Sequence, residues 1–143
     1  MQLNRILSNF VVTEDGIQKI HHLLTHLVKD VDAKAAMLVE KSGQMIATDG
    51  DVQGLDIQAI ASLVSGAFAS TRAVARLIGE AEFQAMFQQG DQASIFMYAL
   101  GSNDILVVIF NDVSKTGLVK VQAQQTAMAL SNEIAQMQST NNP

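Results

Sequence analysis

The sequence predicts a single three-layer domain of the α/β (α+β) class, in which a five-stranded antiparallel sheet carries helices on both faces. Two observations predict this class. The expected elements follow the order helix, two strands, helix, three strands, helix. Residues 105–110 (Ile-Leu-Val-Val-Ile-Phe) are apolar at every position, which is typical of a central strand that is covered on both sides.

Composition excludes several classes of function. The chain has 143 residues, 48% of them hydrophobic and 16% charged, as expected for one globular domain. Its net charge is -5 and its nine Lys and Arg residues are scattered, so we expect no nucleic-acid partner. Cysteine is absent, which leaves no disulfide or thiol chemistry. The longest fully apolar run is far too short for a membrane span, and we expect a soluble cytoplasmic protein without membrane insertion.

No motif for cofactor binding or catalysis occurs. There is no Gly-rich phosphate loop followed by Lys-Ser/Thr, and no dinucleotide fingerprint between a strand and a helix. The histidines are confined to one segment, so a Ser-His-Asp arrangement cannot be identified. We therefore expect no cofactor, no bound metal and no enzyme activity of the chain's own.

The chain divides into three parts: an N-terminal extension at 1–12, a domain at 13–138 and a polar tail at 139–143. The extension is ambiguous, because its apolar residues have helical spacing over a segment too short to form a stable helix. Those residues are Leu3, Ile6, Leu7 and Phe10. The polar tail is expected to fray.

The first helix of the domain is expected from a Thr13 cap to about Val31, with acidic residues in its first turn. Its core-facing residues are Ile17, Ile20, Leu24, Leu27 and Val31. His22 and His26 are four residues apart, a spacing that can bind a metal. No third ligand completes a metal site on this helix, so a solvated polar face is the favoured interpretation.

Five strands are expected. Residues 33–40 and 44–48 flank the Lys41-Ser-Gly43 turn, and residues 83–89, 94–100 and 105–110 supply the other three strands. The acidic loop around Asp49 and Asp51 lacks the ligand spacing of a calcium hand and is interpreted as a plain loop. A last helix, capped by Asp112 or Ser114, is expected to about Gln138. Its core-facing residues are Val119, Ala123, Thr126, Leu130, Ile134 and Met137.

The central helix is expected over residues 55–79, with Asp56 at its start and Gly79 just after its end. Three- and four-residue spacing predicts a core-facing stripe on it. The stripe comprises Ile60, Val64, Ala67, Thr71, Val74 and Ile78.

The opposite face of this helix is small and nearly uncharged, whereas a solvated helix face normally carries Lys, Glu and Gln. It comprises Ala59, Ser62, Gly66, Ala69 and Ala73, and ends near Arg76. Alanine could be present for helix propensity alone. Gly66 argues against that, because glycine inside a helix costs about 1 kcal/mol relative to alanine. The favoured interpretation is an interface that another backbone can approach closely.

Several segments resemble the roadblock family. Residues 33–47, with their Lys-Ser-Gly turn, are similar to that family's first hairpin. Residues 60–69 and 77–83 resemble the central helix and the following segment of its MglB-type members. Residues 105–110 and 116–121 resemble the last strand and the start of the final helix. The resemblance extends from Ile17 to Met137, nearly the whole domain.

The resemblance implies a homodimer in which central helices pack together and the third strands pair to extend the sheet. The dimer contacts it implies here are Ala59, Leu63, Ser70, Leu77, Phe83, Met86 and Phe87. Such pairing would also cover an open sheet edge.

The resemblance further implies a partner. MglB-type proteins bind the GTP form of a small Ras-like GTPase of the MglA type, stimulate its GTP hydrolysis and set polarity in motile bacteria, concentrated at a cell pole. They supply no arginine finger. The GTPase-binding residues implied here are Ser62, Gly66, Ala69, Arg72, Ala73 and Arg76. Two alternatives remain: a roadblock scaffold that binds a GTPase complex without changing turnover, and a profilin-like module that binds a small ligand.

Overall fold

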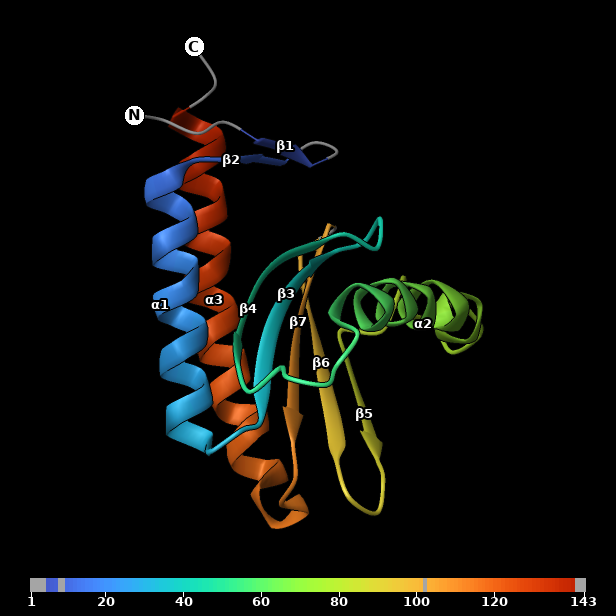
Figure 1. Cartoon of the computed structure of the whole chain (residues 1–143). Coiled ribbons are helices and arrows are strands. Elements are labelled where there is room, and N and C mark those ends of the chain that lie inside the picture. The colour runs from blue at the N-terminus through green and yellow to red at the C-terminus, as the bar shows by residue number, and fades with distance from the viewer. Residues whose placement is uncertain (1–4, 8–9, 102, 141–143) are drawn as a thin grey trace.

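The computed structural model describes residues 5–7, 10–101 and 103–140, and gives side-chain surroundings for 13–101 and 103–138. It forms three layers, with α1 and α3 side by side on one face of the sheet and α2 on the other (Figure 1). The three α-helices are α1 (Glu14–Val31), α2 (Ile57–Leu77) and α3 (Thr116–Thr140), with a short 3-10 turn η1 (Val113–Lys115) before α3. The predicted class and element order are therefore confirmed.

The sheet is antiparallel and has the spatial order β4-β3-β7-β6-β5. Its strands are β3 (Ala35–Glu40), β4 (Met45–Gly50), β5 (Ala85–Gln89), β6 (Ser94–Leu100) and β7 (Asp104–Phe110). Every residue of β7 is buried, because this strand lies in the middle of the sheet beneath helices on both faces. The central position expected from its uninterrupted apolar sequence is confirmed.

Helices α1 and α3 close one face of the sheet. Thr13 caps α1 as expected, its Oγ1 accepting a hydrogen bond from the Gly16 N–H at 3.0 Å. Asp112 caps η1 rather than α3 itself, accepting from the Ser114 N–H. The expected core stripes are buried except Ile17 and Thr126, which are half-buried; Ala127 is buried beside Thr126. The two helices bury a continuous apolar cluster between themselves and the sheet.

Of the helices that the structure describes, α2 alone covers the other face. Asp56 caps it by accepting from the Ala59 N–H at 3.1 Å, and Gly79 follows the helix with φ +92, as a helix-ending glycine should. The expected core stripe of α2 is wrong at its C-terminal end, because Val74 and Ile78 are 52% and 68% exposed. Of its other members, Val64 is buried, and Ile60, Ala67 and Thr71 are half-buried. The residues of α2 that are buried are Ala61, Val64, Ser65, Phe68 and Ala75. Apolar residues lie on both sides of this helix, so spacing alone could not select the buried side.

The N-terminal extension contains strands instead of helical turns. Residues Arg5–Leu7 (β1) pair antiparallel with Phe10–Val12 (β2), and the resulting two-stranded sheet lies beyond one end of α1 and α3 (Figure 1). A hairpin satisfies backbone groups across two short strands, whereas a helix of this length has too few hydrogen bonds. Leu3, and residues 141–143 of the tail, lie outside the described residues. No helix of the described segments is long and apolar enough to cross a membrane.

Candidate docking surface on helix α2

The small stripe expected on α2 lies on the surface of the protein. All five of its members are exposed: Ala59, Ser62, Gly66, Ala69 and Ala73. Gly66 has no steric role among the described residues, because a Cβ placed there would meet none of their atoms within 4 Å. Glycine inside a helix lowers the free energy of unfolding relative to alanine, and packing within the fold does not explain why glycine occurs at this position.

One flank of the stripe is hydrogen-bonded to the turn between β3 and β4. Gln58 Nε2 donates to the Gly43 carbonyl at 2.9 Å, and the Ser62 hydroxyl donates to the same oxygen at 3.4 Å. The Ser65 hydroxyl donates to the Lys41 carbonyl. Gly43 is required here by its φ of +98. The turn and the polar flank of α2 thus form one continuous surface.

Ion pairs also connect the β3–β4 turn, helix α2 and the segment that follows it. Lys41 Nζ donates to Glu82 Oε1 at 2.6 Å, and Arg72 Nε lies 3.6 Å from Glu82 Oε2. The hydrogen bond from Lys41 holds the pKa of the Glu82 carboxyl below its ordinary value, against the effect of burial. Of the two arginines expected in the site, Arg72 is half-buried and paired with Glu82, whereas Arg76 is exposed. Sequence reasoning missed Glu82, and no motif around it marks the contact.

The other flank of α2 is apolar and unusually exposed. Leu63 is 74% exposed and Leu77 86%, beside the exposed Val74 and Ser70. These side chains lie next to the small stripe around the helix circumference. The exposed surface of α2 therefore has one band of small residues and a neighbouring band of large apolar residues. Contiguous exposed apolar side chains of this kind mark contact surfaces.

Strand β5 lies at the edge of the sheet and pairs only with β6 among the described strands. Phe83 and Met86 are half-buried, and the Thr71 hydroxyl lies 3.7 Å from Met86 Sδ on the α2 side. Phe87 points to the opposite side, where its ring stacks on Phe110 with 6.2 Å between centroids, and remains 40% exposed. The expected dimer residues thus lie on the outer flank of α2, along β5 and in the segment before it.

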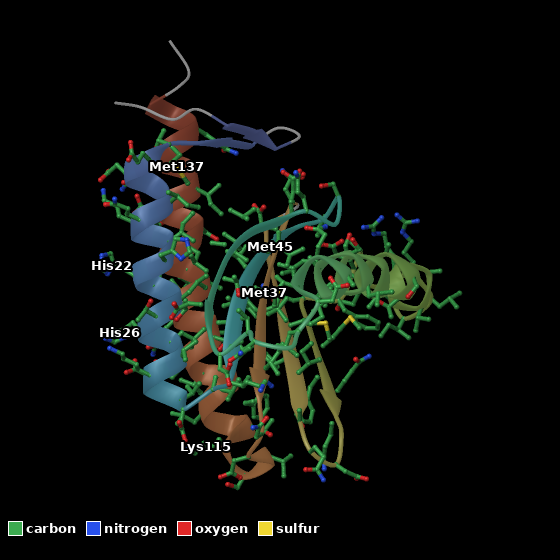
Figure 2. The ribbon with its side chains drawn as sticks, in the orientation of Figure 1. His22, His26, Met37, Met45, Lys115 and Met137 are labelled. Carbon is green, nitrogen blue, oxygen red and sulfur yellow. The ribbon has the colours of Figure 1, made fainter. Side chains whose placement is uncertain are left out.

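The histidine pair does not join this surface. His22 and His26 project from the outer side of α1 (Figure 2), and both are exposed. His26 Nδ1 lies 2.9 Å from Asp30 Oδ2 on the same helix. Within the described segments no three His, Cys, Asp or Glu side chains come together as metal ligands.

The fold has its central helix packed on one face of an antiparallel five-stranded sheet, and the edge of β5 is open. This arrangement is that of the roadblock class of α+β domains. A family model for the Roadblock/LC7 domain matches residues 19–110, and the chain belongs to that family.

Among solved structures, the chain is similar to MglB of Myxococcus xanthus, with 38% identity and a TM-score of 0.76 over 80% of this chain and 93% of that one. It is also similar to MglB of Thermus thermophilus, with 24% identity and a TM-score of 0.85 over 92% of this chain and 99% of that one. An MglB with a tetrameric arrangement gives 24% identity and a TM-score of 0.87 over the same shares. The comparison with curated protein sequences gives no match. The chain is therefore an MglB-like roadblock domain.

Proposed function

We propose that this chain is a homodimeric regulator of a small Ras-like GTPase of the MglA type. It binds the GTP form through the small stripe of α2 and stimulates GTP hydrolysis by positioning groups of the GTPase. The observation that carries the proposal is the uncharged outward face of α2. A partner's backbone can approach the stripe closely over two helical turns, because Gly66, Ala69 and Ala73 present almost no side chain.

The role is a regulatory one, without a catalytic residue supplied by this chain. Arg72 is engaged by Glu82, so its guanidinium is not free to reach a phosphate without breaking an ion pair. Arg76 is exposed near the end of the stripe and contributes charge to the contact. Similarity to MglB of Myxococcus xanthus over most of both chains supports this assignment.

The dimer is proposed to form through the apolar flank of α2 and the edge strand β5. Leu63 and Leu77 are too exposed to stabilise the isolated chain, and pairing of β5 with a second copy would satisfy its free backbone groups. Light scattering should give about twice the 15.4 kDa chain mass at micromolar concentration. The double variant Leu63→Asp/Leu77→Asp should give the single-chain mass. A wild-type protein that stays monomeric would refute the dimer.

The test of function is single-turnover GTP hydrolysis by the small Ras-like GTPase of the same organism, with and without this protein. We expect an acceleration of about tenfold or more, equivalent to about 1.4 kcal/mol of transition-state stabilisation. Ala69→Arg should abolish both acceleration and binding of the GTP form, because a long charged side chain blocks the stripe. Gln124→Arg, on an exposed position of α3, is the matched control and should change neither.

Other outcomes distinguish the alternatives. Tight binding of the GTP form without acceleration would identify a roadblock scaffold instead of an activator. If Ala69→Arg binds as tightly as the wild type, the small stripe is not the contact surface. Failure to bind either nucleotide form would refute the proposed partner.

A further inference from the structure

A groove lies between the C-terminal half of α3 and the end of β6, on the face of the sheet opposite α2. One part has a volume of about 270 Å³ and is lined by Tyr98, Ala127 and Met128, among others. A second part, of about 170 Å³, is lined by Asn103, Asp104, Ile134 and Gln138. Leu100, Gly101 and Ser131 line both parts, so the two adjoin each other. Met128 is 71% exposed at this groove.

Asp104, at one end of this groove, is buried beside a second carboxylate, Glu40. Glu40 on β3 and Asp104 on β7 are directly opposite each other in the antiparallel ladder, and are only 3% and 5% exposed. Glu40 Oε1 accepts a hydrogen bond from the Ser42 hydroxyl at 2.5 Å. Asp104 Oδ1 has no hydrogen-bond partner among the described residues, although it is fully buried. A buried acceptor without a donor is costly, and like charges opposite each other add to that cost.

No cation of the described chain is dedicated to this pair. Lys41 is the positive charge that acts on Asp104, and its ammonium donates to Glu82. Helix α3 faces the site with uncharged residues, Ser131, Ile134, Ala135 and Gln138. Burial first, and the charge of Glu40 second, raise the pKa of Asp104 to about 6. At neutral pH the buried Asp104 carboxylate is therefore negatively charged and has no cation dedicated to it.

We propose that this groove binds a segment of a protein partner, with an arginine side chain reaching Asp104 and a neighbouring large apolar side chain packing on Met128 and Tyr98. A guanidinium supplies the donors that Asp104 lacks, and Asn103 and Gln138 have further acceptor oxygens beside it. Leu100 and Ile134 form an apolar wall for the aliphatic stem of arginine. A metal ion fits less well, because no third ligand side chain accompanies the two carboxylates in the described segments.

The groove is independent of the proposed GTPase surface. It opens beside α3, whereas the small stripe is on α2, and the sheet separates the two layers (Figure 1). A second partner could therefore bind while α2 is occupied. This gives the domain two docking faces, one small and uncharged and the other apolar with a buried negative charge.

The test uses the full chain labelled with ¹³C at its methionine methyl groups, so that Met128 reports on the groove in NMR spectra. The probe is N-acetyl-leucyl-arginine amide, and the matched control is the same dipeptide with citrulline, which keeps the shape of arginine but not its charge. We expect the arginine probe to shift the Met128 methyl signal and to bind about tenfold or more tightly than the citrulline probe. Binding should weaken as the pH falls through about 6, where Asp104 takes up a proton.

Two variants complete the test. Asp104→Asn removes the charge at nearly constant shape and should weaken binding of the arginine probe about tenfold, to the level of the citrulline probe. Asp91→Asn, an exposed carboxylate in the β5–β6 turn, should leave binding unchanged. Equal affinity of the two probes, unaltered binding by Asp104→Asn, or no shift of Met128 at millimolar probe would each overturn the proposal.

Discussion

The two faces of the sheet are covered in different ways. On one face, α1 and α3 pack on the strands and on each other, and Ile20, Leu24 and Leu130 have no exposed surface. On the other face, α2 has no helical neighbour among the described elements, and Leu63 and Leu77 are exposed to solvent. Two helices that share a sheet face cover each other's apolar surface, whereas a single helix leaves its outer flank exposed.

The buried side chains of α2 explain how this difference arises from sequence. Ala61, Val64 and Phe68 belong to the apolar cluster between α2 and the sheet, and Ala75 is buried nearer the end of the helix. Ala61 lets the helix lie close to the strands, while Val64 and Phe68 fill the space beside it. Further large apolar residues, Leu63, Val74 and Leu77, occur on the outward flank. The comparison implies that core substitutions on the two faces will have unequal effects on stability.

The largest expected effect is on the face covered by α1 and α3. Leu24→Ala should lower the free energy of unfolding by about 3 kcal/mol, because it leaves a cavity at a fully buried site. Leu77→Ala should change the free energy of unfolding by less than about 0.5 kcal/mol, because that side chain is already exposed. Urea denaturation at low protein concentration measures both variants. A Leu77→Ala loss that grows with protein concentration would show that a second copy covers α2. Equal losses in dilute protein would contradict the comparison.

Asp104 lies on the side of the sheet that α3 covers, and its buried charge lowers the free energy of unfolding at neutral pH. Because its folded-state pKa is raised to about 6, the folded protein holds the proton more tightly than the unfolded chain does. Stability should therefore fall as the pH rises from about 4 to 6 and stay low above that range. Asp104→Asn should raise the free energy of unfolding by up to about 3 kcal/mol near pH 8 and by little near pH 4. Thermal unfolding across this range measures the effect, and a variant less stable than wild type at high pH would contradict it.

Glu82 supports the α2 side through charge. Its pKa is lowered by Lys41, so its contribution is present above its ordinary pKa and is lost as the pH falls through the lower folded-state value. Glu82→Gln should cost about 1 kcal/mol at neutral pH, because the contact is partly exposed. The difference from wild type should vanish in strong acid. Urea denaturation at both pH values decides this, and a loss that is independent of pH would show that packing, not charge, is responsible.

Apart from the near-neutral Leu77→Ala, the smallest expected effect on stability is that of Gly66→Ala, which should act in opposite directions on folding and on binding. Gly66→Ala should raise the free energy of unfolding by about 0.5–1 kcal/mol, since a methyl group there meets no atom of the chain. The same methyl group should weaken binding of the GTPase, because it stands in the small stripe. Calorimetric measurement of unfolding and of binding on one sample tests both. A variant that gains stability and keeps full affinity would remove Gly66 from the docking surface.

Much of the fold could be predicted from local patterns. Thr13, Asp56 and Gly79 mark helix ends through hydrogen bonds or backbone angles that depend on those residue types. The uninterrupted apolar run of β7 indicated its central place. The exposure of Val74 could not be predicted, because α2 is apolar on more than one side and the buried side is chosen by tertiary packing.

The candidate site was less accessible to sequence reasoning than the fold. The small stripe could be recognised because its residue types are unusual for a solvated face, and all its members are exposed. The bond from Lys41 to Glu82, and the opposition of Glu40 and Asp104, join residues far apart in the chain. Strand register sets the second of these contacts, and no local pattern specifies that register.

The position of β7 also has a consequence for how the protein folds during synthesis. The strand at the centre of the sheet is the last of the five to be made, and it joins β3 to β6 by pairing Ala35 with Ile109 and Ser94 with Phe110. Until it has left the ribosome, the β3–β4 and β5–β6 hairpins have no strand between them. The inner edge of β6 stays unpaired until the next strand is made, and the inner edge of β3 waits for a contact of high sequence separation. A nascent chain that stalls before Asp104 therefore holds two separate open-edged hairpins, a state exposed to aggregation and to chaperone binding.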